Sequence, residues 1–381
     1  MIASQPMVAP ALELEVATPR GSGKLGRAGE FLVVGGATLP LLPLALLLRR
    51  VFGLDSAELA VGFVAFHAAH VINDPHFAVT YLLFYRNVRE RAFSRAFSLR
   101  QRARYWIAGV GVPVLLGGFT LFALARHSAE KVGYLLQLMF LLVGWHYVKQ
   151  GFGVLTVISA RHGVRLSTGE RRAFLAHCVS AWLFARANPR DFGHEASSDG
   201  VYFMTFPHPP GLELATRVAF AASALGLGFV LVRKWRREGR LPPLAALVGF
   251  LVTVWLWTAF SRIDPLLVYV IPALHSIQYL YFVWLSRRNE AVEKCGPPAF
   301  ESVGKAMFRL SLGGIVLGWF LFRGLPPLLD EYLVLKDPFD PLGETPYFAA
   351  LGTFVNIHHY FMDSVIWRRE NPETRYLLTR A

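Results

Sequence analysis

The sequence of 381 residues is poor in charged side chains and nearly free of cysteine. Charged residues make up 17% of the chain, whereas soluble globular chains average about 25%. Two cysteines, Cys178 and Cys295, cannot build a disulfide scaffold, nor a zinc finger by themselves. Low-complexity tracts are also missing and 54% of the residues are hydrophobic, which excludes a disordered chain. The composition therefore points away from a soluble enzyme and toward a membrane protein.

Apolar segments of membrane-spanning length recur along the whole chain. A bilayer core of about 30 Å needs roughly 20 mainly apolar residues per helix. The candidate segments are 31–48, 57–85, 105–125, 132–158, 171–186, 212–232, 243–261, 265–286, 306–323 and 346–367. The second is too long for a straight crossing, and Asp74-Pro75 inside it predicts a kink, because proline removes a backbone donor. We therefore predict an all-α polytopic transmembrane helical bundle of about ten spans.

The net charge of +13 is concentrated between the apolar segments. Arginine and lysine occur in bursts, for example over 86–104 and 233–240. Such bursts set the orientation of membrane helices and attract anionic lipids. With ten spans, most of the basic residues fall on the side that carries both termini, so we predict a multi-pass protein of the inner membrane with cytoplasmic termini. No motif for nucleic-acid binding occurs, and no nucleic-acid partner is expected.

The chain divides into one membrane domain and two tails. Residues 1–28 lack periodicity, and their charges follow the mildly apolar part, unlike a signal peptide. We predict a flexible cytoplasmic tail over 1–28, a single transmembrane helical domain over 29–367 and a cytoplasmic tail over 368–381. No internal repeat of the kind found in many transporters is present.

Seven of the twelve histidines fall inside four predicted spans. An ionisable side chain in the bilayer costs about 2.5–3.5 kcal/mol when charged and usually faces the bundle interior. His67, His70 and Asp74 share one helical face at spacings of three and seven residues, and His359 and Asp363 share another. The predicted metal ligands are His67, His70, Asp74, His76, His146, His275, His358, His359 and Asp363.

This set of side chains indicates metal chemistry. Imidazole and carboxylate ligands together suit iron, zinc, manganese or copper. The number of ligands exceeds the need of one tetrahedral ion, so we expect a dinuclear centre or one metal with polar surroundings. A proton or ion pathway and structural hydrogen bonding are the alternative interpretations. Tyr147 and Tyr279 are predicted to donate hydrogen bonds or protons, and Lys149 to pair with Asp74 or Asp363 or to bind an anionic head group.

At His67-x-x-His70 and His358-His359 the chain resembles the histidine-rich integral membrane di-iron oxidases of the desaturase and hydroxylase type. No HxxxH or complete HxxHH box occurs. A weaker likeness is to the retinal-forming Brp/Blh carotenoid-cleaving membrane proteins.

The resemblance implies iron-dependent O₂ activation on a lipophilic substrate that enters from the bilayer, with an electron donor protein as a partner. Zinc or another divalent metal remains an alternative to iron. We therefore expect a membrane oxidoreductase with a non-haem iron centre. The alternative is a proton- or ion-coupled membrane transporter that uses buried His, Asp and Lys side chains.

Overall fold

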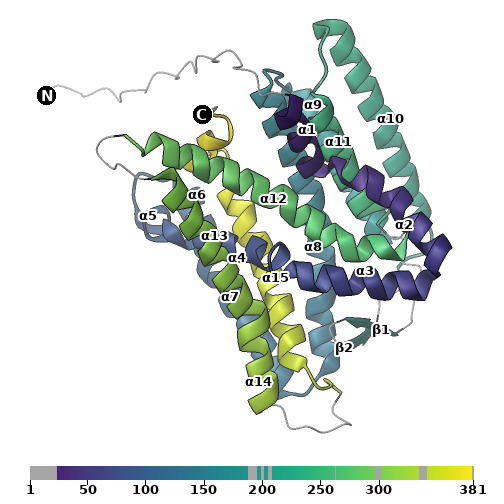
Figure 1. Ribbon diagram of the computed structural model, residues 1–381, viewed down its shortest axis with the longest axis vertical. Coiled ribbons are helices and arrows are strands. Elements are labelled where there is room, and N and C mark those ends of the chain that lie inside the picture. The colour runs from purple at the N-terminus through teal and green to yellow at the C-terminus, as the bar shows by residue number, and fades with distance from the viewer. Residues whose placement is uncertain are drawn as a thin grey trace, which may run out of the picture.

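The computed structural model describes residues 24–187, 195–198, 201–204, 208–261, 263–296, 302–333 and 341–379. Almost all of them are helical, which confirms the all-α class (Figure 1). The exception is a short antiparallel pair, β1 (Glu195–Ser198) and β2 (Val201–Met204). Of the tail predicted over 1–28, residues 1–23 lie outside the described residues. Helix α1 begins at Lys24, inside the predicted tail.

The helices follow one another along the whole described chain. The first part of the chain forms α1 (Lys24–Phe31), η1 (Leu32–Gly36), α2 (Thr38–Phe52), α3 (Leu54–Ala69), α4 (Asn73–Arg86), α5 (Val88–Phe93), α6 (Leu99–Trp106), η2 (Ile107–Gly111) and α7 (Val112–Ala125). The middle forms α8 (Ala129–Arg161), α9 (Thr168–Ala187), α10 (Leu212–Glu238), α11 (Leu244–Leu251) and η3 (Val252–Ala259). The last part forms α12 (Pro265–Glu293), α13 (Val303–Trp319), η4 (Phe320–Gly324), α14 (Leu325–Leu333), α15 (Pro346–Ile366) and η5 (Pro372–Leu377).

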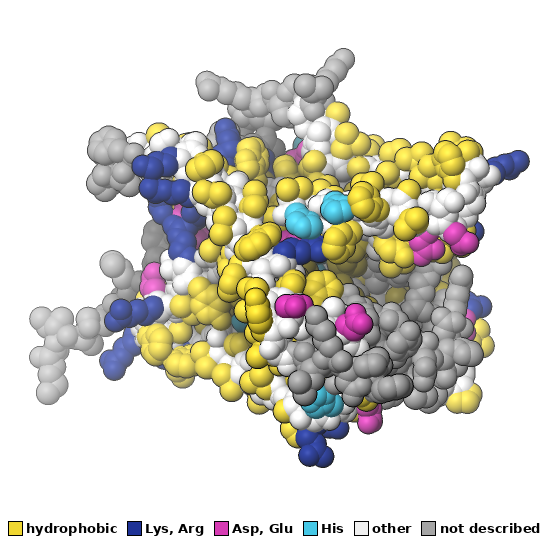
Figure 2. All heavy atoms as spheres, turned by 60° about the horizontal axis from the view of Figure 1, so that its bottom comes forward, with side chains coloured by type: hydrophobic (Ala, Val, Ile, Leu, Met, Phe, Trp, Pro, Cys, Tyr) yellow, Lys and Arg dark blue, Asp and Glu magenta, His cyan; other side chains and the backbone are white. Residues whose placement is uncertain are grey.

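Several helices have the length and composition of membrane spans. Four qualify outright: Leu99–Ala125, Leu212–Glu238, Pro265–Glu293 and Val303–Leu333. A fifth span results if Gly26–Gly36 and Thr38–Phe52, bent by 58°, cross as one unit. The predicted number of about ten spans is therefore not confirmed. Many large hydrophobic side chains are exposed on the helices, and they dominate the face in Figure 2. Such an apolar exterior indicates a membrane protein.

The second predicted span is a pair of separate helices. Helix α3 ends at Ala69 and α4 begins at Asn73. Pro75 lies in the first turn of α4, where its missing N–H would have no helical acceptor. The segment therefore breaks one turn before Asp74-Pro75, where a kink is predicted, and the proline lies in the first turn of the new helix. In Figure 1, α3 runs across the direction that α8 follows.

Four helices surround the predicted site. Helix α15 packs against both α8 and α4, and α4 also packs against α12. A large apolar cluster beside them joins α8, α9 and α11 through residues such as Leu155, Phe174 and Phe250. On the other side, α13 packs closely on α4, because Gly314 and Gly318 present no side chain there. The site is therefore enclosed by packed helices.

Gly318 permits this close approach, because a Cβ atom there would lie 2.7 Å from the backbone carbonyl carbon of Asp74. Replacing Gly318 by alanine should lower the free energy of unfolding by about 1–3 kcal/mol through overpacking. Thermal unfolding in detergent measures the change. Gly228→Ala on α10 is the matched control, since no atom lies within 4 Å of its Cβ position. Alanine at residue 228 should be neutral or slightly stabilising, and equal destabilisation of both variants would contradict the close contact.

Candidate metal centre

Four buried histidines from four different helices meet in the bundle. They are His76 on α4, His146 on α8, His275 on α12 and His359 on α15. The ring centroids of His76 and His359 are 4.5 Å apart, and those of His146 and His275 are 4.9 Å apart. All four side chains are buried, with at most 6% of any residue exposed. The structure thus brings together one histidine from each of the four spans in which the sequence analysis placed them.

The ring nitrogens are spaced like ligands of a single ion. One nitrogen each from His76, His146 and His359 lies within 4.8 Å of the other two. The Nε2 atoms of His146 and His275 are 3.1 Å apart. Two imidazole nitrogens bound to one metal at about 2.1 Å lie about 3.0–3.4 Å from each other. The His146–His275 contact therefore fits two neighbouring ligands, as well as a hydrogen bond in which one nitrogen is protonated.

Several of these nitrogens have no partner within the described residues. They are Nε2 of His76, Nδ1 of His275 and both ring nitrogens of His359. A buried polar atom that forms no hydrogen bond costs about 1–3 kcal/mol. A bound cation would accept the lone pairs that the protein leaves free. The side chains present therefore fit a metal ion held by three or four imidazoles.

Ser276 and Asn73 determine the tautomer of His76. The Ser276 hydroxyl donates to Asn73 Oδ1 at 2.8 Å and lies 3.0 Å from His76 Nδ1. Because its single hydrogen goes to Asn73, the hydroxyl accepts from His76 Nδ1–H. This arrangement leaves the lone pair of His76 Nε2 available to a metal. The sequence analysis missed Ser276, although a hydroxyl residue directly after His275 was a usable signal.

Asp363 lies beside the histidines and faces one of them, but it is not in the group of side chains that could hold the ion. Its Oδ2 atom is 3.6 Å from His146 Nδ1, and its Oδ1 accepts a hydrogen bond of 2.6 Å from Trp367 Nε1. A carboxylate on the far nitrogen of a metal-bound histidine orients the ring and raises its basicity. Asp363 is thus placed to support His146, and Trp367, which the sequence analysis did not single out, holds Asp363.

His358 is buried, but both of its nitrogens are engaged. Its Nε2 lies 2.9 Å from the carbonyl oxygen of Ala108, and its Nδ1 lies 3.0 Å from the Tyr81 hydroxyl. A carbonyl only accepts, so Nε2 is the donor and Nδ1 accepts from Tyr81. No lone pair remains for a metal. The prediction that His358 is a ligand is therefore wrong in this arrangement, and its direction differs from that of His359 by about 100° around the helix.

His67 and His70 lie apart from the cluster. Their rings stack with centroids 6.2 Å apart, and His67 is exposed. The predicted common face of His67, His70 and Asp74 is wrong, because α3 ends at Ala69 and α4 starts in a new direction.

Asp74 has a different partner from the one predicted. Its Oδ2 atom lies 3.4 Å from Nε of Arg323 on η4, whose guanidinium also lies over the ring of Phe66 at 4.1 Å. Among the described residues, the group of side chains that could hold an ion is His76, His146 and His359, and it does not include Asp74. Arg323 is not among the predicted site residues, and its only signal in the sequence is an arginine at the end of an apolar segment.

The predicted tyrosines line the cluster, whereas the lysine does not. The Tyr147 ring is 4.4 Å from that of His275, and the Tyr279 ring is 4.5 Å from that of His76. Lys149 is exposed, and its ammonium lies 5.5 Å from the Phe152 ring. Its predicted pairing with a buried aspartate is wrong, because the long side chain extends along aromatic surface to the outside.

Comparisons of this chain with protein-family models, with curated proteins and with solved structures find no match. Its function must therefore be inferred from the chemistry of the site itself.

Alanine substitutions of the buried histidines should differ in their effect on the amount of metal bound to the protein. His146→Ala and His359→Ala should each lose bound metal, because each removes an imidazole of the cluster. His358→Ala is the matched control, since it removes an equally buried neighbour whose nitrogens are both hydrogen-bonded. Elemental mass spectrometry on detergent-purified protein measures the metal, and circular dichroism checks the fold. Equal metal content in all three variants would contradict the assignment.

The hydroxyl of Ser276 should matter for affinity rather than for folding. Ser276→Ala frees the His76 ring from its fixed tautomer, so the metal should bind about 10–100-fold more weakly. Ser276→Thr keeps the hydroxyl and should retain most of the affinity. Competition with a chelator of known affinity provides the measurement. Equal affinity of the alanine and threonine variants would show that the hydroxyl does not position His76.

Proposed function

We propose that this protein is an intramembrane oxidoreductase that uses a non-haem iron centre to act on a lipophilic substrate. The observation that carries the proposal is the cluster of four buried histidines with unpartnered nitrogens, built from four helices of an apolar bundle. Imidazole ligands suit iron, copper, zinc and nickel. The apolar exterior places the protein among lipophilic compounds, and we propose that such a compound enters the bundle from the bilayer.

We favour one iron over two. A second ion would need ligands beyond the cluster, but the other predicted ligands are engaged or distant. His358 is hydrogen-bonded through both nitrogens, Asp74 pairs with Arg323, and His67 and His70 lie on the exterior. Bound iron would supply the activation of O₂ for oxidation of the substrate.

The remaining residues orient the ligands and shape the site. Ser276 holds the His76 tautomer, and Asp363 supports His146. Tyr279 is itself held, because its hydroxyl lies 2.7 Å from Thr80 Oγ1 and accepts from Trp367 at 3.4 Å. The hydroxyl of Tyr147 forms no hydrogen bond to another described residue, and its ring lies against His275. Tyr147 is therefore the better placed of the two predicted tyrosines to donate a proton to a substrate.

We also propose the full arrangement of about ten spans in an inner membrane. Helices α8, α9 and α15 have 33, 20 and 21 residues, which is long enough to cross. Their mean hydropathy is reduced partly by side chains such as His146 and His359, which face the interior and not the lipid. A polar interior is compatible with a spanning helix, because only the lipid-facing side must be apolar.

Contacts at one end of the bundle support the proposal that both termini lie on the same side of the membrane, in the cytoplasm. Glu30 near the start of the described chain contacts His162 after α8, and Arg161 donates to the carbonyl of Leu377 near the end. Arg86 at the end of α4 pairs with Glu290 at the end of α12. The positive-inside rule assigns this end to the cytoplasm.

The resemblance to histidine-rich membrane oxidases, and more weakly to carotenoid-cleaving membrane proteins, is consistent with this chemistry. The expected partners are the bilayer, a lipophilic small molecule and an electron donor protein. The alternative of a proton- or ion-coupled transporter needs buried His, Asp and Lys side chains together. It is less well supported, since Lys149 lies outside the bundle.

The test is metal analysis followed by oxygen consumption. Protein in nanodiscs should contain about one equivalent of iron, and it should consume O₂ with at least one member of a panel of fatty acids, sterols and carotenoids. His359→Ala should lose both properties, while His358→Ala should retain both. Zinc in place of iron would contradict oxidative chemistry. Folded protein without metal that moves protons in proteoliposomes would establish the transporter instead.

A further inference from the structure

The basic end of the bundle contains a cavity that is separate from the histidine cluster. We define the basic end as the ends of α4, α12 and α15 together with the C-terminal turn η5. Asn289 on α12 donates to the carbonyl of Tyr376 in η5 at 2.8 Å, which holds this turn against the helix. Beneath it lies a partly enclosed cavity of about 40 Å³, whose polar lining includes Arg86, Arg91, Arg287, Glu290 and Glu373.

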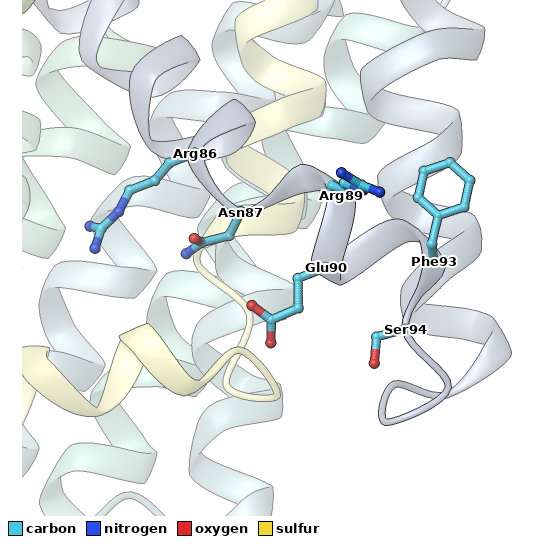
Figure 3. A pocket seen from close by; sticks show the side chains of 6 residues that line it. All are labelled: Arg86, Asn87, Arg89, Glu90, Phe93 and Ser94. Atoms are coloured by element: carbon cyan, nitrogen blue, oxygen red, sulfur yellow. The ribbon is translucent and has the colours of Figure 1, made fainter.

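An open cleft of about 530 Å³ adjoins this cavity and shares Arg86 and Asn87 with it. The turn between α4 and α5 forms the cleft. Figure 3 shows Asn87 and Glu90 pointing to the side on which the C-terminal segment lies, while Arg89 and Phe93 lie on the other side of the turn. The shared residues place the cleft where a ligand would enter the cavity from outside.

The charges around the cavity do not cancel. Glu290 is contacted by Arg86 at 2.7 Å, by Lys294 at 2.7 Å and also by Arg287. Glu373 pairs with Arg91 and accepts from Asn87 at 2.9 Å. In the lining itself three cations share two carboxylates, which leaves an excess of one positive charge, and Lys294 adds another cation beside Glu290. An excess of this size in a partly enclosed space attracts an anion.

The buried side chain of Arg91 is a second observation that points to a bound anion. Only 5% of the residue is exposed, and its guanidinium lies over the Phe97 ring at 4.5 Å. Its Nη2 pairs with Glu373, but its buried Nη1 has no hydrogen-bond partner anywhere in the described ranges. A buried guanidinium N–H without an acceptor is costly. The acceptor that is missing must be anionic or polar, and the nearby carboxylates already hold cations.

We propose that this cavity binds a phosphate group, with Arg91 as the principal ligand and Arg86 and Arg287 in support. Guanidinium groups bind phosphate oxygens through paired charge-assisted hydrogen bonds. The apolar part of the lining, which includes Phe84 and Trp367, lies at the ends of membrane helices, where lipid phosphates are found. The phosphate therefore comes from an anionic phospholipid or from a soluble phosphate. The site does not depend on the proposed iron chemistry.

The binding experiment uses the full chain in phosphatidylcholine nanodiscs with two probes. In one arm phosphatidic acid is added to the nanodisc lipid, and in the other inorganic phosphate is added to the buffer. The midpoint of thermal unfolding should rise with one of the probes, and native mass spectrometry should detect lipid retained in the first arm. Arg91→Gln should weaken the apparent affinity about tenfold or more, because it removes a charged hydrogen-bond donor. A wild-type protein that responds to neither probe would overturn the proposal.

Two controls separate phosphate binding from folding. Glu373→Gln breaks the same Arg91–Glu373 pair but increases the positive excess, so it should retain or strengthen binding. Arg236→Gln removes an exposed charge on α10 and should have no effect. Equal weakening by Arg91→Gln and Glu373→Gln would show that only the fold was disturbed. If Arg236→Gln weakens phosphate binding as much as Arg91→Gln does, net charge alone attracts the anion.

Discussion

Every polar atom buried in an apolar helical bundle needs a partner, because water is not available to provide one. This requirement distinguishes the histidines of this protein. His177 meets it within the protein, since Nδ1 contacts Ser223 at 2.9 Å and Nε2 accepts from Trp255 at 2.8 Å. His358 meets it through Tyr81 and Ala108. In the central cluster His76, His275 and His359 each keep at least one ring nitrogen without a partner among the described residues, and that difference, rather than the number of histidines, identifies the cluster as a candidate metal site.

The scaffold supports this cluster from all sides. Each histidine of the cluster comes from a different helix, so a bound metal would connect α4, α8, α12 and α15 and contribute its binding free energy to the folded state. The residues behind the ligands are provided by the same helices. Ser276 follows His275 on α12 and hydrogen-bonds His76 on α4, and Asp363 on α15 faces His146 on α8. Ligand orientation and helix packing therefore depend on each other.

Trp367 connects the cluster with the basic end. Its indole N–H donates to Asp363, which faces His146, and its side chain also lines the cavity near Arg91. The ion pairs around that cavity join α4 to α12 and α5 to the C-terminal turn, which are distant in sequence. The end of the chain predicted as a tail over 368–381 is therefore packed on the bundle as far as it is described, and it closes the cavity.

The sequence alone determined the helical class and much of the helix placement, because apolar length and the cost of buried polar groups are properties of short segments. The span predicted at 346–367 corresponds to Pro346–Ile366, and the histidines inside the predicted spans include all four of the cluster. Only the tertiary structure decided which histidines meet. The break between α3 and α4 removes His67 and His70, and contacts across 277 and 249 residues of sequence engage His358 with Tyr81 and Asp74 with Arg323. Hydrogen-bond partners that come from distant segments leave no periodic signal, so the sequence pattern did not distinguish a satisfied histidine from a free one.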